Sequence, residues 1–170
     1  IAEEAENMIM KLSVREKLEV AEEFIDEMKL EEALEVLDEL PETTEDKDLS
    51  YRMNYARGFC HKAFSEFEEA IEAYEKALLI NNTDTLLLCE LGICYAYIGE
   101  FEQSLEFYLS ALDIEPQSTE ILSNTAVVYL NMRDIENAKL YIRKAMEIDP
   151  NDEIIESTLK AIRTLEETEK

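Results

Sequence analysis

Residues 85–116, TLLLCELGICYAYIGEFEQSLEFYLSALDIEP, decide the fold, because their pattern recurs at an offset of 34 residues on both sides. Gly92 aligns in this way with Gly58 and Ala126. The same offset aligns three further sets: Tyr74, Tyr108 and Ile142; Ala77, Ala111 and Ala145; and Ile80, Ile114 and Ile148. A fixed period of about 20–50 residues is typical of stacked repeat proteins, which act mostly by presenting a surface to a partner.

Helix signals dominate each repeat. Five residues suited to the N-cap precede the apolar-periodic runs: Ser13, Ser50, Asp84, Ser118 and Asp152. The side-chain oxygen of such a residue accepts a hydrogen bond from a free backbone N–H at the helix start, and Glu16 completes a capping box with Ser13. The pattern predicts helix pairs at 51–64 with 67–79, 85–98 with 101–112, and 119–132 with 135–146. Breaks are expected at Ser65-Glu66, Gly99-Glu100 and Arg133-Asp134.

The repeats resemble the tetratricopeptide repeat (TPR) family. The fullest match is Leu88, Leu91-Gly92, Tyr95, Gly99, Phe101, Tyr108, Ala111 and Pro116. Two positions depart from the pattern, since Ser104 replaces the usual Ala and His61 stands where the other units have Tyr. The resemblance implies an all-α fold, a right-handed α-α superhelix of stacked antiparallel helix pairs with a terminal capping helix. Repeats are expected at 51–84, 85–118 and 119–152.

The flanking segments fit the repeat less well. Residues 14–50 are interpreted as a degenerate first repeat followed by an acidic loop, and residues 153–170 as the capping helix that an open solenoid end requires. Residues 1–13 are interpreted as a short amphipathic helix of uncertain role. It could cap the first end, belong to a preceding domain or lie in the groove.

Small residues at the repeated positions predict close packing within each helix pair. Gly58, Gly92 and Ala126 let the first helix of a pair approach the second. Alanine or serine at Ala70, Ser104 and Ala138 does the same from the second helix.

Charge and composition narrow the class of partner. Of 170 residues, 41 are acidic and 16 basic, which gives a net charge of −25. Nucleic acid and anionic membranes are therefore disfavoured, because both need clustered Lys and Arg. A protein or peptide with basic flanks is attracted to such a surface, although acidity is also a common means of solubility. Oligomeric state, pathway and the identity of the partner do not follow from the sequence.

Chemistry-bearing clusters are not recognisable in the sequence. Cys60, Cys89 and Cys94 are an odd number without metal-ligand spacing, which favours free thiols in a reducing compartment and a cytoplasmic location. The single histidine, His61, is expected to pack in the core. We therefore expect no enzyme activity, no catalytic residues, no cofactor and no metal.

The inward faces of the first helices give the candidate site. By resemblance to TPR arrays, where these helices line a concave groove, the groove residues are Arg52, Tyr55, Phe59, Lys62, Leu86, Cys89, Ile93, Ala96, Tyr97, Glu120, Ser123, Val127, Leu130 and Asn131. Steps of three and four residues place each set on one helix face. The alternative is that residues 1–12, the loop at 41–50 or the terminal helix covers this stripe.

A known groove chemistry can be excluded. The carboxylate clamp of some TPR proteins needs Lys, Asn and Arg, but its positions align here with Tyr55, Phe59, Glu90, Glu120 and Asn124, or with Leu18, Glu22, Ala56, Leu86 and Glu90. The leading hypothesis is a protein-interaction module, an adaptor or scaffold that binds a peptide or amphipathic segment in a partly apolar, acidic-rimmed groove. The alternatives are a secretion or assembly chaperone that holds an apolar client segment, and a structural segment of a longer array or regulator.

Overall fold

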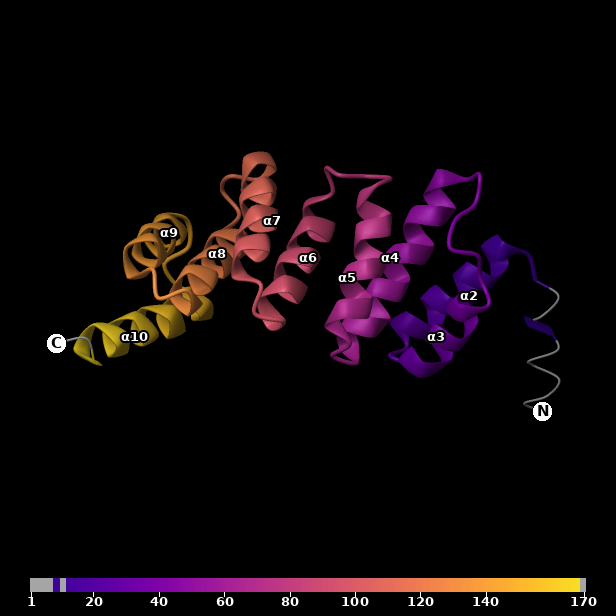
Figure 1. The fold of residues 1–170 in the computed structure, drawn as a ribbon, viewed down its shortest axis with the longest axis horizontal. Coiled ribbons are helices and arrows are strands. Elements are labelled where there is room, and N and C mark those ends of the chain that lie inside the picture. The colour runs from indigo at the N-terminus through magenta and orange to yellow at the C-terminus, as the bar shows by residue number, and fades with distance from the viewer. Residues whose placement is uncertain (1–7, 10–11, 169–170) are drawn as a thin grey trace. The chain divides into compact units, whose positions relative to one another are not determined.

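The computed structural model describes residues 8–9 and 12–168, and all regular structure in this part of the chain is α-helical. The chain divides into two compact units, Ile1–Asn82 and Thr83–Lys170. Figure 1 labels four helices of unit 1: α2 (Val14–Asp26), α3 (Leu30–Asp38), α4 (Lys47–Ala63) and α5 (Phe67–Leu78). Unit 2 contains α6 (Thr85–Tyr97), α7 (Phe101–Ile114), α8 (Thr119–Asn131), α9 (Ile135–Ile148) and α10 (Glu153–Thr168). The predicted all-α class is confirmed.

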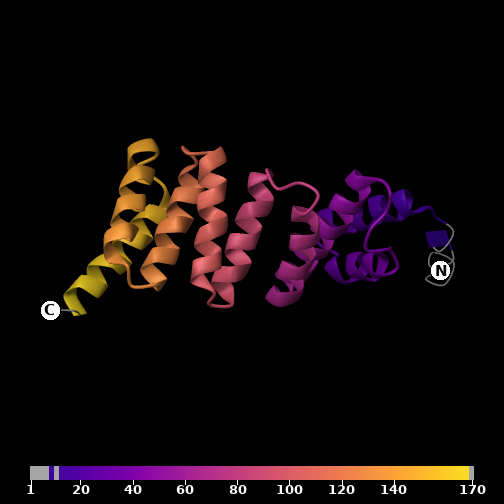
Figure 2. The ribbon, with the colours of Figure 1, turned by 45° about the horizontal axis from the view of Figure 1, so that its top comes forward.

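Unit 1 is built from two helix pairs. α2 packs against α3, α4 packs against α5, and α4 also contacts α2 and α3 (Figures 1 and 2). Leu18, Leu37 and Met53 are completely buried between these helices. Each apolar stripe thus faces a neighbouring helix, which is the arrangement that amphipathic helices require.

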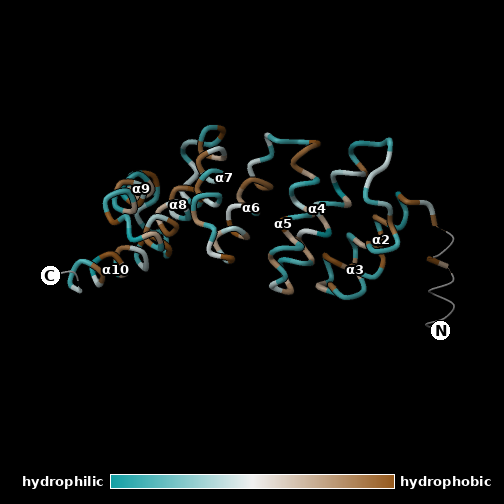
Figure 3. The backbone as a smooth tube through the Cα atoms, in the orientation of Figure 1, coloured by the Kyte–Doolittle hydropathy of each residue, from teal (hydrophilic) through white to brown (hydrophobic). Residues whose placement is uncertain are grey.

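Unit 2 repeats the same construction. α6 packs against α7, α8 against α9, and α10 lies against both α8 and α9. Leu87, Leu91 and Ile142 are among its completely buried side chains. In Figure 3 the backbone of α5 in unit 1 alternates between hydrophilic and hydrophobic colours. The sequences of α7 and α9, which are also the second helices of their pairs, alternate similarly. Helices with this pattern bury one face and leave the other in water.

Each helix pair reverses direction at a residue with positive φ. Ser65 (φ 63°), Gly99 (φ 83°) and Arg133 (φ 60°) lie at the three predicted breaks, which are thereby confirmed. The following N–H reaches back to close the first helix: Glu66 donates to His61 O at 2.9 Å, Glu100 to Tyr95 O at 3.0 Å and Asp134 to Tyr129 O at 2.9 Å. A left-handed residue followed by such a bond is a common helix C-terminus. Met28 (φ 59°) makes the same turn in the α2–α3 pair.

Four of the five predicted N-caps are confirmed by hydrogen bonds. Ser13 forms the predicted capping box, and Asp84, Ser118 and Asp152 each accept from a backbone N–H at a helix start. The cap predicted at Ser50 is wrong. α4 begins at Lys47, where Asp46 Oδ1 accepts from the N–H of Asp48 at 3.0 Å. Ser50 is buried inside the helix instead, and its Oγ accepts from the N–H of Thr44 at 2.7 Å. Asp46 and Ser50 both suit an N-cap, but Ser50 bonds to the loop that precedes the helix, and Asp46 takes the cap position.

The small residues lie at close helix contacts, as the sequence predicts. A Cβ atom added at Gly58 would lie 2.4 Å from Cδ1 of Tyr74, and one added at Gly92 would lie 3.0 Å from the Tyr108 ring. The Ser104 hydroxyl, also buried, donates to Gly92 O at 2.7 Å. The α4–α5 contact is therefore tighter than the α6–α7 contact.

Candidate functional site

The largest group of predicted groove residues meets in unit 2. Ile93, Ala96 and Tyr97 on α6 line a pocket of about 560 Å³ together with Val127 and Asn131 on α8. Its remaining lining residues are Phe101, Tyr108, Asn124 and Val128. Every one of these side chains is uncharged. We name this the unit 2 pocket.

Large apolar side chains are exposed on the same helix. Tyr97 is 70% exposed and Leu86 is 57% exposed, although both are on α6, whose sequence is the most apolar of the first helices. Burying such side chains is favourable, at about 25 cal/mol per Å² of apolar surface. Where exposed apolar side chains form a patch, they typically mark an interaction site.

A second pocket lies in unit 1, between α2 and α4. It encloses about 360 Å³ and is lined from α4 by Tyr51, Arg52, Tyr55, Ala56 and Phe59, and from α2 by Glu22, Ile25 and Asp26. The sequence predicted three of these residues, Arg52, Tyr55 and Phe59, as groove residues. We name this the unit 1 pocket.

Arg52 is held firmly at the edge of the unit 1 pocket. Its Nε donates to Glu22 Oε1 at 3.0 Å and its Nη2 donates to Glu22 Oε2 at 2.5 Å. The paired hydrogen bonds that Arg52 donates to Glu22 raise the pKa of Arg52 above its usual value. Lys62 lies nearby in sequence, with Nζ 5.6 Å from the centroid of the Phe59 ring. Side chains of both signs thus surround the aromatic rings.

Several predicted groove residues lie elsewhere. Ser123 is completely buried, so it does not line an open groove as predicted. Leu130 lines another cleft of unit 2, together with Ala161 and Leu165 of α10, and Asn131 borders both this cleft and the unit 2 pocket. Four further predicted residues line neither named pocket: Lys62, Leu86, Cys89 and Glu120.

Sequence reasoning missed the contribution of α2. Ile25 and Asp26 line the unit 1 pocket, and so does Tyr51, which is four residues before Tyr55 on the same helix face. The four-residue spacing of Tyr51, Tyr55 and Phe59 was the available signal. α2 gave none, because its repeat is too degenerate to assign an inward face.

Self-occupancy of the pockets was the alternative hypothesis. The predicted helix at 1–13 lies largely outside the described residues, and within it Met8 is 72% exposed while Ile9 packs against the unit 1 core. The acidic loop is tied to another side of α4, because Asn54 Nδ2 donates to Glu42 O at 2.9 Å. Asn54 does not line the unit 1 pocket. The loop therefore does not cover the unit 1 pocket. α10, in contrast, forms one side of the cleft that Leu130 lines.

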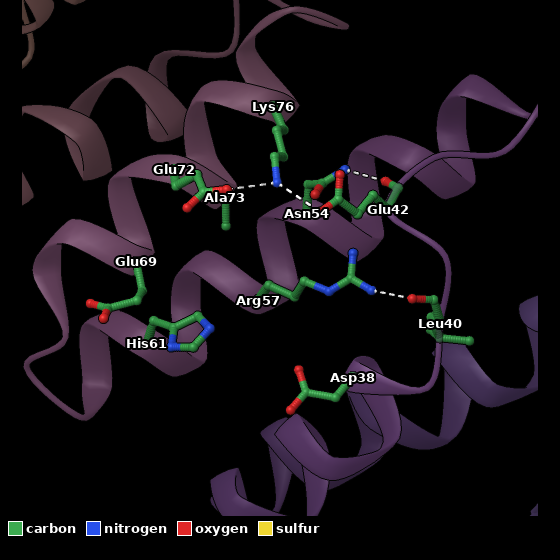
Figure 4. Close-up of a pocket in the computed structure, with 10 residues that line it drawn as sticks. All are labelled: Asp38, Leu40, Glu42, Asn54, Arg57, His61, Glu69, Glu72, Ala73 and Lys76. Atoms are coloured by element: carbon green, nitrogen blue, oxygen red, sulfur yellow. Dashed lines mark hydrogen bonds and ion pairs between the residues drawn. The ribbon is translucent and has the colours of Figure 1, made fainter.

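Unit 1 also contains a polar cleft of about 280 Å³. Its charged and polar lining residues include Arg57, His61, Lys76, Asp38, Glu42, Glu69 and Glu72 (Figure 4). The prediction that His61 packs in the core is wrong. His61 is half-buried, and its Nδ1 lies 2.7 Å from Glu66 Oε2.

The repeat pattern explains why this cleft is open. In unit 2, Tyr95 stacks on Phe107 with ring centroids 5.5 Å apart, and Tyr129 stacks on Tyr141 at 5.4 Å. In unit 1 the position equivalent to Phe107 and Tyr141 is Ala73. Unit 1 therefore lacks the second ring, and its first ring is the imidazole of His61. Polar side chains occupy the space that the stacked rings fill in unit 2.

Arg57 forms the floor of the polar cleft. Its Nη2 donates to the carbonyls of Leu37 and Leu40, both at 2.7 Å, and to that of Pro41 at 3.3 Å. Its Nη1 is buried and has no acceptor among the described residues. Burial lowers the pKa of Arg57 below its usual value. The side chain therefore anchors the end of α3, and the surrounding carboxylates disfavour an added anion.

The three cysteines are free thiols, with Cys60 and Cys94 buried. Burial raises the pKa of Cys60 to about 11 and that of Cys89 to about 12. An unfolded cysteine ionises near pH 8.5. Above that pH the unfolded chain loses thiol protons that the folded chain keeps, so the free energy of unfolding should fall as the pH rises from about 8.5 towards 11.

This pH dependence is measurable by urea denaturation at pH 7.5 and pH 10. The loss of stability between the two pH values should be smaller in the Cys60→Ala/Cys89→Ala variant than in the unchanged chain. An equal loss in both proteins would contradict the assignment to these thiols. In the folded protein at pH 8, a disulfide reagent should react with Cys60 only as fast as the protein opens.

In residues 8–9 and 12–168, His, Cys, Asp and Glu side chains do not gather in threes as a metal site would require. None of the described helices has the length and hydropathy to span a bilayer.

The TPR family model matches residues 51–84, 87–118 and 119–152, which together are more than half of the chain. This protein belongs to the tetratricopeptide repeat family, as predicted from its repeats. No curated protein is significantly similar to it in sequence.

Solved structures of TPR proteins share the fold. A TPR protein from Parabacteroides merdae superimposes with a TM-score of 0.81 at 20% identity, over 91% of this chain and 60% of that protein. The second TPR domain of human RPAP3, solved with the HSP70 peptide SGPTIEEVD, gives a TM-score of 0.61 at 16% identity, over 65% and 92%. The TPR domain of Sgt2 from Aspergillus fumigatus gives 0.63 at 23%, over 74% and 83%. At these identities the likeness establishes the fold.

Proposed function

We propose that this chain is an adaptor or scaffold module that binds an apolar peptide or amphipathic segment of another protein. The observation that carries the proposal is the unit 2 pocket, an uncharged cavity of about 560 Å³ beside the exposed ring of Tyr97. Apolar side chains of a helical or extended segment fit a groove of this kind. The RPAP3 domain, which has the same fold, was solved with a peptide bound.

The chemistry of the partner segment differs from that of an acidic tail. The clamp positions hold Tyr55, Phe59, Glu90, Glu120 and Asn124, and carboxylates there repel a terminal carboxylate. The net charge of −25 favours a protein segment with basic flanks over nucleic acid or an anionic membrane. The mostly buried thiols, which form no disulfide in the described part of the chain, suit a reducing compartment such as the cytoplasm.

A selection of displayed peptides against the whole chain supplies a ligand for calorimetry. Ile93→Asp and Tyr97→Asp should each weaken binding of the selected peptide at least tenfold, because a carboxylate in an apolar contact must be desolvated without a partner. Circular dichroism should stay unchanged, since Tyr97 is exposed and Ile93 is only half-buried.

The matched control is Leu140→Asp, an apolar side chain of α9 that is 45% exposed and lines neither named pocket. It should bind the peptide as the unchanged chain does. Normal binding by Ile93→Asp and Tyr97→Asp would show that the unit 2 pocket is not the binding site.

A further inference from the structure

We propose that the unit 1 pocket binds a positively charged side chain, lysine or arginine, of the partner segment. The inference rests on the proposed function, because it specifies one residue of the segment that the module binds.

Aromatic faces line the α4 side of the pocket. Tyr51, Tyr55 and Phe59 follow one another at four-residue steps, so all three rings lie on one face of α4. The Tyr51 and Tyr55 ring centroids are 6.1 Å apart with an interplanar angle of 27°. The Tyr55 ring also packs against the buried Tyr74 at 5.6 Å, which holds it in place. The electron-rich faces of such rings attract ammonium and guanidinium groups.

A carboxylate without a partner completes the pocket on the α2 side. Asp26 lines the pocket and is exposed, and its carboxylate makes no hydrogen bond or ion pair with any described residue. It is also the last residue of α2, where the carbonyl ends of the helix favour a cation. Glu22, the other carboxylate of the pocket, is already bound by Arg52.

The net charge of the side chains that line the unit 1 pocket favours a cation. Glu22 and Arg52 neutralise each other, so Asp26 leaves one uncompensated negative charge among the lining residues. Within this chain, Lys62 already places its ammonium 5.6 Å from the Phe59 ring, and Lys29 lies 5.9 Å from the Phe24 ring. The first contact shows that Phe59 is accessible to an ammonium group.

The size of the unit 1 pocket and its difference from the unit 2 pocket determine which side chain it accepts. The volume of about 360 Å³ lies within the roughly 300–1,000 Å³ range of ligand pockets and accommodates a single long side chain. The unit 2 pocket has aromatic and apolar lining but no carboxylate, so it would take an uncharged side chain. The two pockets thus differ in the one feature that discriminates a cation.

The test uses N-acetyl-lysine methylamide as the probe, titrated into the ¹⁵N-labelled whole chain and followed by amide chemical shifts. Saturable shifts should be confined to α2 and α4, with a dissociation constant on the order of a few millimolar. The norleucine analogue, which has the same chain length without the ammonium group, should bind at least about fivefold more weakly. The arginine analogue should bind the same residues.

Asp26→Asn should weaken binding of the lysine probe about threefold or more, and binding should weaken further as salt is raised. Asp113→Asn is the control, because it removes one carboxylate from an exposed site on α7 in the other unit. Equal binding of the lysine and norleucine probes, or unchanged lysine binding by Asp26→Asn, would overturn the proposal. Peptide binding through Ile93 and Tyr97 is a separate measurement, so failure here leaves the proposed function standing.

Discussion

Replacing Gly58 with alanine should lower the free energy of unfolding by about 2 kcal/mol. The added Cβ atom would lie 2.4 Å from Cδ1 of Tyr74, a distance that no relaxed structure keeps. The ring cannot easily move, because Tyr74 is completely buried and packs against Tyr55. Alanine is the better helix former by about 1 kcal/mol, and the overpacking must exceed this gain. Urea denaturation followed by circular dichroism measures the difference.

The same substitution at Gly92 is the control within the chain. There the added atom would lie 3.0 Å from the ring edge of Tyr108, so a shift of a few tenths of an ångström relieves the contact. The propensity gain then offsets most of the cost, and we expect a change within about 0.5 kcal/mol. Equal losses at Gly58 and Gly92 would contradict the packing argument.

The repeat at residues 119–152 shows how the clash at Gly58 can be relieved. It has Ala126 at the position of Gly58 and Ile142 at the position of Tyr74, and both are completely buried. The double variant Gly58→Ala/Tyr74→Ile should therefore lose less stability than the sum of the two single changes. A favourable coupling of about 1 kcal/mol or more is expected from the double-mutant cycle.

The helix pairs and their turns could be predicted because local chemistry determines them. Ser13, Asp84 and Ser118 satisfy N–H groups of their own helices, and Gly99 adopts a backbone conformation that glycine tolerates best. The start of α4 was wrong by four residues, since Asp46 and Ser50 both suit a cap and only packing of the loop against Ser50 decides between them.

The site was less predictable, since it depends on contacts between helices. The steps of three and four residues identified Ile93, Ala96 and Tyr97, because residues on one helix face follow from periodicity alone. Asp26 was missed because α2 is distant in sequence from Tyr55 and has no clear repeat register. His61 was misplaced because its environment depends on the residue opposite, where Ala73 leaves space that a ring fills elsewhere.

Replacing Arg57 with alanine should give the second large loss of stability. The Arg57 guanidinium donates three hydrogen bonds to carbonyls of Leu37, Leu40 and Pro41, at and just beyond the end of α3. Carbonyls at a helix C-terminus have no partner within the helix, so these bonds hold the chain where it leaves α3. Arg57→Ala removes all of them at once. Since a hydrogen bond to a charged group contributes roughly 1.5–3 kcal/mol, we expect a loss of about 2 kcal/mol after water replaces part of the contact.

The loss should be local as well as global, which distinguishes it from a general packing defect. Amide hydrogen exchange in residues 37–49 should accelerate in Arg57→Ala more than exchange in α7 or α8, because the loop loses its anchor. Arg57→Lys keeps a charged donor and removes the unsatisfied Nη1, so it should retain about half of the lost stability. If Arg57→Ala unfolds at the same urea concentration as the unchanged chain and its exchange pattern is unaltered, then other contacts hold this loop, and the polar cleft can be redesigned without cost to the fold.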